Sequence, residues 1–287
     1  MQAPTFSVIT PSRNCGKFLE DAILSVAQQQ GVTVEHVVQD SLSSDCTLEI
    51  LRRYRDVRWQ WESDGGQSDA INRGFLRATG DLVGWLNADD YYLPGGLAAI
   101  AKAADEHPEA DVFYGDCIFV DGEGSVVRSK VEHDFDRDIL FYFGCYIPST
   151  ATFFRRRVIE RGYLMDCDFR VCMDFEYFVR LACDGFQFHY VPRFVAAFRW
   201  HEDNISLQQA ERRLFERLEV QRRYGRRVRS QTQMELLRQG VRVKRILRKI
   251  ASGNAMRELR MRQQRGENTL WMHSEEAQAK CSSLACL

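Results

Sequence analysis

The stretch ATGDLVGWLNADD, residues 78–90, decides the fold of this chain. Residues 81–86 form an apolar run typical of a buried strand, and polar residues follow it directly, ending in Asp89 and Asp90. In open α/β sheets, ligands bind outside the carboxyl ends of the strands. The stretch therefore predicts a strand that presents two adjacent carboxylates to a ligand.

These two carboxylates predict a divalent metal site. Adjacent carboxylates at the end of an apolar strand are costly unless a cation or ordered donors compensate their charge. Hard oxygen ligands suit Mg²⁺ or Mn²⁺, and such ions keep open positions that phosphate oxygens can fill. The alternative is that Asp89 and Asp90 only begin a surface loop, because Asp is also a common helix N-cap.

The rest of the chain alternates strand-like and helix-like segments, a pattern that builds a mostly parallel sheet with helices on both faces. Besides residues 81–86, we expect strands at residues 5–10, 34–39, 57–62, 112–114, 118–120, 125–131 and 194–198. Helical spacing of apolar residues predicts helices at residues 18–26, 46–54, 68–78, 96–105 and 175–182, and further helices from 207 onward.

Three further positions carry candidate chemistry. Asp40 ends an apolar strand and precedes a polar turn, where it either binds a ligand or caps the next helix. Asp174 and Glu176 open an apolar helix, and one of them could accept a proton from an attacking hydroxyl or serve as a cap. His201 follows an apolar strand, and a neutral imidazole there could complete a metal site begun elsewhere.

Composition places the chain among globular proteins. It has 287 residues, 45% of them hydrophobic, which is enough for one main domain with an appendage. We find no uninterrupted apolar run long enough to span a bilayer and no basic-then-apolar leader, so we expect a cytoplasmic protein. The nine cysteines include no C-x-x-C pair, which favours reduced thiols.

The net charge of -1 hides a strong asymmetry. Residues 207–265 hold 18 Lys or Arg against 5 Asp or Glu, whereas the rest of the chain is acidic. Within residues 241–250 apolar and basic side chains interleave, as in a helix lying on an anionic membrane, and the protein would then be peripheral on its inner face. The alternative is a helix that packs on the core or on another subunit of a homo-oligomer. Nucleic-acid binding is disfavoured because this stretch has few aromatic residues.

Taken in order, these motifs resemble family 2 glycosyltransferases, inverting enzymes with the GT-A nucleotide-diphospho-sugar fold. The resemblance covers about residues 5–206. It implies a Rossmann-like, mostly parallel central sheet flanked by helices, with a helical C-terminal extension. We therefore expect a catalytic domain over residues 1–206 and a basic helical extension over residues 207–287 that ends in a flexible tail.

The resemblance also assigns roles to individual residues. Asp174 falls at the family's catalytic base, and Asp90 with His201 falls at the metal ligands, while Asp89 contacts the ribose or supports the site. The donor-binding residues that it implies are Pro11, Ser12, Arg13, Asn14, Asp40, Gln67, Asp69, Asn72, Arg73, Asn87 and Asp89.

Three positions depart from the family pattern. The turn after Asp40 usually contains glycines, whereas here it reads Ser41-Leu42. Ile71 stands where many relatives have an arginine, so Arg73 or Arg13 would have to contact the donor phosphates. Met173 precedes the base where glutamate is common, which leaves Glu176 as a second candidate for the base.

The resemblance implies transfer of a sugar from a nucleotide-diphosphate donor to a hydroxyl of a saccharide or lipid-linked acceptor, with inversion and with Mn²⁺ or Mg²⁺. Synthesis of cell-surface polysaccharide, lipopolysaccharide or glycolipid is the expected setting. One alternative is a nucleotidyltransferase-like enzyme, although residues 14–17 match its phosphate loop poorly. The other is a non-catalytic nucleotide-binding protein. Every acidic position expected in the family is filled here, which argues against this alternative.

Overall fold

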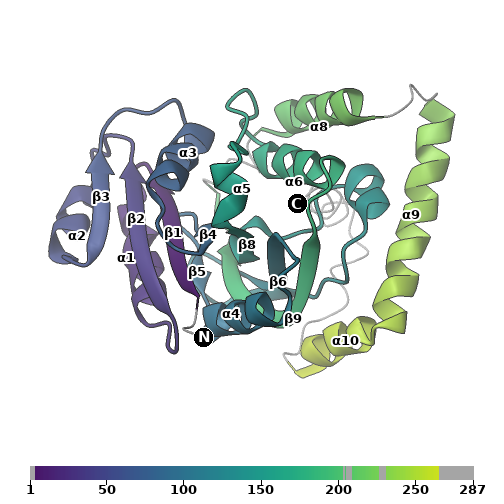
Figure 1. Ribbon diagram of the computed structural model, residues 1–287, viewed down its shortest axis with the longest axis horizontal. Coiled ribbons are helices and arrows are strands. Elements are labelled where there is room, and N and C mark those ends of the chain that lie inside the picture. The colour runs from purple at the N-terminus through teal and green to yellow at the C-terminus, as the bar shows by residue number, and fades with distance from the viewer. Residues whose placement is uncertain (1–3, 203, 205–208, 226–230, 265–287) are drawn as a thin grey trace.

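The computed structural model describes residues 4–264 except 203, 205–208 and 226–230, and Figure 1 shows their arrangement. The flexible tail predicted at the C-terminus and the predicted domain junction at residues 206 and 207 lie outside the described residues. The described cysteines are all free thiols, as expected for that part of the chain. Among the described helices, none is long and apolar enough to cross a membrane.

The N-terminal half is a parallel sheet with the strand order β3-β2-β1-β4. Its strands are β1 (Thr5–Ser12), β2 (Thr33–Asp40), β3 (Val57–Trp61) and β4 (Leu82–Trp85). The connecting helices are α1 (Gly16–Ala27), α2 (Thr47–Arg53) and α3 (Gln67–Arg77). β1 is almost wholly buried because helices cover both faces of the sheet, and its apolar residues Phe6, Val8 and Ile9 therefore do not alternate strictly with exposed polar ones.

The sheet continues through antiparallel and parallel neighbours in the order β4-β8-β6-β9-β5, with β7 paired to β6. These strands are β5 (Tyr91–Tyr92), β6 (Val112–Val120), β7 (Val126–Lys130), β8 (Thr152–Arg155) and β9 (Phe188–Arg199). The helical segments between them are α4 (Gly96–Glu106), η1 (Ile139–Phe143), η2 (Ser149–Ala151), α5 (Arg156–Glu160) and α6 (Met173–Cys183). The mixed α/β architecture confirms the predicted fold class.

The two short strands predicted at residues 112–114 and 118–120 are wrong, because β6 is one continuous strand through Gly115 and Asp116. Its pairing with β9 shifts register at these two residues, so a bulge forms there without ending the strand. A side chain at Gly115 would collide with Val195 of β9. The glycine that suggested a break instead permits close approach of the neighbouring strand.

Three C-terminal helices pack against this body, and Figure 1 shows α8 above α6 and α9 along one side. They are α8 (Ala210–Tyr224), α9 (Gln231–Ala251) and α10 (Asn254–Gln264). The basic face of α9 is turned inward: Arg245 lies 2.9 Å from Glu132, and Lys244 and Arg248 lie 2.7 and 2.8 Å from Asp136. The predicted helical extension is therefore attached to the body by ion pairs.

The apolar core lies directly under the functional end of β4. Trp85, the last residue of that strand, stacks on Phe154 of β8 with 5.8 Å between ring centroids and an interplanar angle of 2°. Phe178 of α6 packs against both rings, 6.2 Å from Trp85 and 6.3 Å from Phe154 between centroids. Because all three rings are buried, they fix the position of β4 relative to α6.

Candidate active site

The carboxyl ends of β1, β2 and β4 meet at one edge of the sheet. Ser12 at the end of β1 pairs in register with Asp40 at the end of β2, and the Leu86 N–H donates to Ile9 O at 2.8 Å. The polar residues that follow β1, β2 and β4 therefore lie side by side. This edge is where the sequence predicts the ligand site.

Asp40 is fully buried and shapes the turn that follows it. Its Oδ1 accepts the Ser43 N–H at 2.8 Å, and its Oδ2 accepts the Ser43 hydroxyl at 2.6 Å. Leu42 has φ 52°, a left-handed conformation that usually favours glycine. The turn thus adopts a glycine-like backbone although its residues are Ser41-Leu42, and the cost of this conformation marks a constrained loop.

The loop after β1 is joined to this turn. Asn14 also has a positive φ of 52°; its N–H donates to Ser43 Oγ at 2.7 Å, and its Oδ1 accepts the Ser44 N–H at 2.8 Å. Pro11 is half-buried and Arg13 is exposed at the same rim. The Ser12 hydroxyl is buried, and within the described part of the chain it has no hydrogen-bond partner. An unused buried hydroxyl at this edge is a group that a ligand could satisfy.

Asp90 is buried and held by three donors of the protein. Its Oδ1 accepts the Arg199 N–H at 2.8 Å, and its Oδ2 accepts Thr150 Oγ1 at 2.9 Å and Asn87 Nδ2 at 3.0 Å. Burial, and after it the charge of Asp89, raises the pKa of Asp90 well above its usual value. These contacts tie Asp90, the predicted metal ligand, to Asn87, Thr150 and the end of β9.

Asp89 faces His201. The two side chains are partly exposed, and His201 Nε2 lies 3.0 Å from Asp89 Oδ2, to which Asn204 Nδ2 also donates at 3.2 Å. The Phe18 ring of α1 packs on the imidazole with 4.9 Å between centroids. The histidine predicted to complete the metal site is thus paired with Asp89 and not with Asp90.

A chain of contacts connects this pair of aspartates to the base predicted on α6. Gln67, the first residue of α3, donates to Asn87 Oδ1 at 2.8 Å, and Asn87 donates to Asp90. The next residue, Ser68, places its hydroxyl 3.1 Å from Met173 Sδ, the neighbour of Asp174. The start of α3 therefore lies between the two sets of carboxylates, which brings them to one region of the surface.

Asp174 sits in the first turn of α6 and is partly buried. Its Oδ1 accepts its neighbour's N–H, that of Phe175, at 2.7 Å, and Cys145 Sγ lies 3.8 Å from its Oδ2. Burial is the main reason that the pKa of Asp174 rises to about 6, against the effects of the Phe175 N–H and of the charge on Lys130. A carboxyl with a pKa near neutrality suits proton transfer at physiological pH.

Glu176 does not compete for the role of base. Its carboxylate is 1% exposed, lies 2.9 Å from Arg180 Nε, and accepts the Tyr224 hydroxyl of α8 at 2.5 Å. The first contact lies within α6, and the second joins α6 to α8. Glu176 is therefore a packing residue at the interface of α6 with α8.

Two residues predicted to bind the donor are engaged elsewhere. Asn72 donates to Met165 O at 2.9 Å and accepts the Met165 N–H at 2.8 Å, so both ends of its amide are used. Arg73 lies 2.9 Å from Asp69 and 3.2 Å from Glu62. The polar groups of Asn72 and Arg73 thus brace the segments around α3, and their predicted donor contacts stay predictions. Asp69 also accepts the Gly65 N–H at 2.8 Å, which shapes the loop before that helix.

Sequence reasoning missed Arg199. This residue ends β9 and is 4% exposed, and besides its N–H bond to Asp90 it donates from Nε to Asp89 O at 2.9 Å. A further bond of 2.6 Å joins its Nη2 to Asp21 of α1. The only available signal was its position two residues before His201 at the end of a strand.

A GT-A sheet that gathers these groups at its carboxyl edge defines the class of the protein: it is a glycosyltransferase. More narrowly, the chain belongs to glycosyl transferase family 2, whose family model matches residues 7–169. Among curated relatives, a PGL/p-HBAD biosynthesis glycosyltransferase of Mycobacterium bovis is 32% identical over 186 residues, which are 63% of this chain and 70% of the relative. An uncharacterized glycosyltransferase of Nostoc is 27% identical, over 56% of this chain and 53% of the relative.

Solved structures show the same fold at low identity. S. aureus TarS 1–349 in complex with UDP-GlcNAc matches with a TM-score of 0.61 and 18% identity, over 82% of this chain and 70% of the other. The mannosyltransferase PcManGT of Pyrobaculum calidifontis, in complex with GDP-Man and Mn²⁺, matches with a TM-score of 0.60 and 17% identity, over 99% of this chain and 80% of the other. The predicted family and fold are therefore confirmed.

Proposed function

We propose that the protein moves a hexose from a nucleotide-diphosphate sugar to an acceptor hydroxyl in one displacement, with Asp174 as the general base. The observation that carries this proposal is a partly buried carboxyl at the start of α6, with a pKa raised to about 6, next to the sheet edge. Asp174 would take the proton of the acceptor hydroxyl as that oxygen attacks the anomeric carbon. A single displacement inverts the configuration at that carbon.

The metal ligands in this proposal are Asp89 and His201. Their side chains already face each other at 3.0 Å and are partly exposed, which fits an ion that meets its donor from outside the protein. Among the described residues no cluster of three or more acidic, histidine or cysteine side chains could hold an ion by itself. Two protein ligands fit Mg²⁺ or Mn²⁺, since these ions commonly take their remaining ligands from phosphates and water. When bound, the ion would neutralise charge on the departing diphosphate.

The chain's own residues would hold the donor along the same edge. We assign the base and ribose to the rim formed by the loops after β1 and β2, with Asp40 as the scaffold of that rim and Ser12 as an unused hydroxyl within it. Gln67 and Asn87 would lie beside the sugar and phosphates, because they lead from α3 to Asp90. Arg13 is exposed and remains the candidate for a phosphate contact.

A cell-surface glycoconjugate is the proposed acceptor. The Mycobacterium relative is named for the biosynthesis of PGL, and the two solved neighbours were captured with hexose-bearing nucleotides, UDP-GlcNAc and GDP-Man. These names support a saccharide or lipid-linked hydroxyl as acceptor and a hexose as the group transferred.

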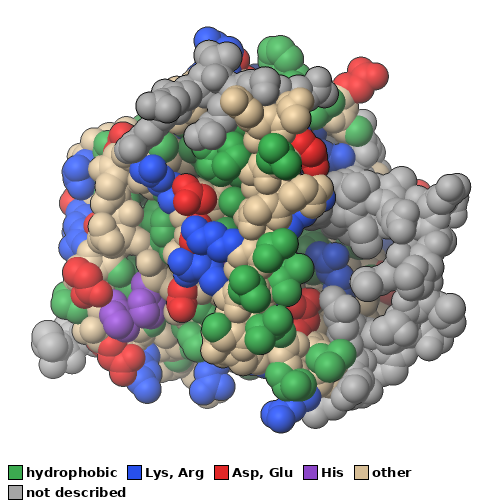
Figure 2. Space-filling view, turned by 90° about the vertical axis from the view of Figure 1, so that its right-hand side faces the viewer, with side chains coloured by type: hydrophobic (Ala, Val, Ile, Leu, Met, Phe, Trp, Pro, Cys, Tyr) green, Lys and Arg blue, Asp and Glu red, His purple; other side chains and the backbone are tan. Residues whose placement is uncertain are grey.

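A peripheral position on an anionic membrane would suit a lipid-linked acceptor, and we assign the contact to the outer face of α9. The cations Lys244, Arg245 and Arg248 of its inner face are paired with the body. Apolar side chains are exposed on the outer face, and Figure 2 looks onto this side of the molecule. Its exposed apolar side chains recur at helical spacing: Leu236, Val243, Ile246, Leu247 and Ile250. Arg242 is exposed beside them.

Vesicle flotation tests this membrane contact. We expect the full chain to float with vesicles that contain anionic lipid and to float less when Ile246→Glu and Leu247→Glu are combined. Arg260→Gln on α10, which removes a charge without touching the stripe, is the control and should lower binding only slightly. If the full chain stays at the bottom with anionic vesicles, or dimerises through the stripe instead, the membrane assignment is wrong.

Ligand-dependent stability tests the proposed function itself. A thermal-shift panel of nucleoside diphosphates and nucleotide sugars, with and without Mn²⁺, should show one nucleotide that raises Tm more in the presence of the metal. Its sugar should then be transferred with release of nucleoside diphosphate. Release of pyrophosphate would instead identify a nucleotidyltransferase, and failure of every nucleotide to raise Tm would contradict the proposal.

A further inference from the structure

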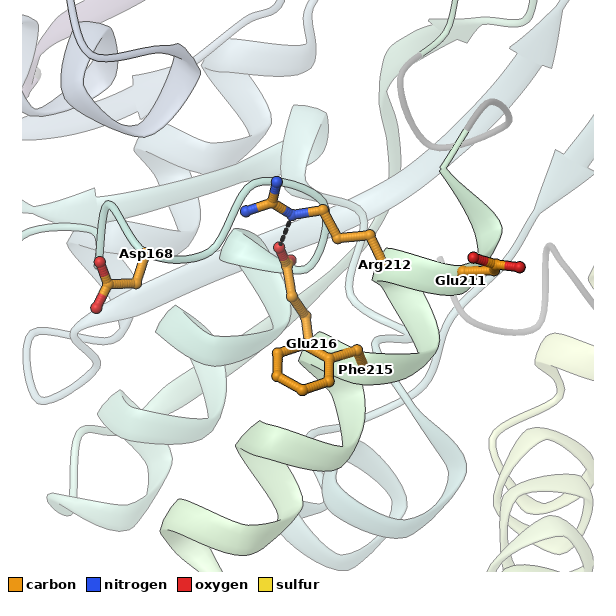
Figure 3. Close-up of a pocket in the computed structure, with 5 residues that line it drawn as sticks. All are labelled: Asp168, Glu211, Arg212, Phe215 and Glu216. Atoms are coloured by element: carbon orange, nitrogen blue, oxygen red, sulfur yellow. Dashed lines mark hydrogen bonds and ion pairs between the residues drawn. The ribbon is translucent and has the colours of Figure 1, made fainter.

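Glu216 of α8 makes an unusual set of contacts with the segment just before α6. It is 3% exposed; its Oε1 accepts the Arg170 N–H at 2.9 Å, and its Oε2 accepts the Val171 and Cys172 N–H groups at 2.9 and 2.8 Å. Arg212 Nε also donates to Oε1 at 2.6 Å, as Figure 3 shows. Burial alone would raise the pKa of Glu216, but Arg212 and these backbone donors hold it below its usual value.

These bonds supply what the start of α6 lacks in its own sequence. The first N–H groups of a helix and of the turn before it have no partner within the helix. Cys172, the residue before α6, makes no side-chain cap. A carboxylate from another helix therefore fixes three successive backbone groups, the last of which lies two residues before Asp174.

The start of α3 and the loop before it, where we assign the donor, also hold this segment. The Ser68 hydroxyl of α3 donates to Phe169 O at 3.1 Å, and the Arg170 guanidinium donates to Gly65 O in the loop before α3. Residues 169–172 are thus clamped between α8 and the start of α3. A shift of this segment would move Asp174 relative to the edge where the donor is assigned.

We propose that Glu216 is a positioning residue that sets the place of Asp174 through residues 170–172. The proposal rests on the assignment of Asp174 as base. A carboxylate is needed because both of its oxygens only accept hydrogen bonds, and they serve four donors here. Glutamine would turn an NH₂ group toward a backbone N–H and leave at least one buried donor unsatisfied.

The Glu216→Gln variant tests this proposal. We expect kcat to fall roughly 10- to 100-fold, because a displacement of about 1 Å in a catalytic group can cost 10²-fold. The donor KM should change by less than about threefold, since Glu216 does not reach the donor edge. The acid limb of the pH profile of kcat should move below about pH 6, because Asp174 becomes less buried and its pKa falls. Amide hydrogen exchange at residues 170–172 should become faster, a readout independent of activity.

Glu219→Gln is the matched control. Glu219 lies one turn further along α8 and pairs with Arg222 and Arg223 of the same helix, so its substitution should leave kcat and exchange at residues 170–172 unchanged. If Glu216→Gln does not fold, Glu216→Asp keeps both oxygens on a shorter stem and should give a smaller loss of kcat with the same pattern.

The outcomes separate this proposal from the proposed function. Suppose that Asp174→Asn is inactive, while Glu216→Gln keeps kcat within twofold and its acid limb does not move. That result overturns the positioning role of Glu216 and leaves Asp174 as the base. An Asp174→Asn variant that keeps full activity overturns the base itself.

Discussion

Neighbouring aspartates have different surroundings in this site. Asp89 and Asp90 are adjacent in the chain; their position after an apolar strand predicts a metal site from the pair, and only the family resemblance places the ligand at Asp90. The division depends on Thr150, Arg199 and His201, which come from segments 60 or more residues away. No local pattern contains those contacts, and this is why the sequence alone could not show how differently the two aspartates are held.

Substitution of the two aspartates tests our proposal that Asp89, and not Asp90, binds the metal. Asp89→Asn should raise the Mn²⁺ concentration for half-maximal activity at least tenfold with little change in Tm, because even indirect ligand contacts are worth 10- to 100-fold in metal affinity. Asp90→Asn should lower the free energy of unfolding by about 1–3 kcal/mol, because its amide cannot accept all three hydrogen bonds. Loss of Mn²⁺ activation in Asp90→Asn alone, with an unchanged Tm, would restore the original assignment.

The pH dependence of kcat tests the protonation state of Asp174. Burial raises its pKa to about 6, and the base works only when it is deprotonated. We therefore expect kcat to be level above pH 7 and to fall about tenfold per pH unit below 6. The measurement is kcat at saturating donor and metal from pH 4.5 to 8.5. A limb near pH 4, the usual range of aspartate, would show that Asp174 is not the enclosed base.

At the level of elements, hydrophobic spacing predicted most strands and helices to within a few residues, as for residues 5–10 against Thr5–Ser12. The predicted elements were wrong or missing where packing against another element determines the secondary structure. β6 continues through Gly115 because β9 packs closely there, and η1 carries no periodic signal of its own. The sequence left open whether the basic face of α9 lies on a membrane or packs on the core, and the structure pairs it with Glu132 and Asp136, acidic residues more than 100 positions earlier in the chain.

The attachment of α9 can be tested at Arg245. Its partner Glu132 is 0% exposed, and the next cation, Lys130, is 3.7 Å away. Arg245→Ala should therefore lower the free energy of unfolding by about 3 kcal/mol, because it leaves a buried charge poorly compensated. Arg242→Ala, three residues earlier on the exposed face, should change it by less than about 0.5 kcal/mol. Equal effects in urea denaturation would contradict the inward ion pair.

Across the whole molecule, residues from widely separated segments gather at one edge of the sheet. The fold class and this edge could be predicted because parallel strands place their carboxyl ends together. Asp40, Asp89 and Asp174 could be proposed as site residues from their positions after strands or before a helix. Glu216 could not be found in this way, because a glutamate in a basic helix gives no sign that it binds backbone groups some 45 residues earlier. The division at residue 206 stays a prediction.

The most direct test of the account is the rate of Asp174→Asn with the donor identified by thermal shift. If Asp174 is the general base, kcat should fall about 10²- to 10⁴-fold, with nucleotide-dependent stabilisation unchanged. Tm at pH 7.5 should not fall. The folded pKa of Asp174 is raised to about 6, so ionisation of this carboxyl destabilises the fold as pH rises from about 4 to about 6. Asparagine does not ionise and carries no such cost. A variant that transfers sugar at nearly the wild-type rate would contradict the account.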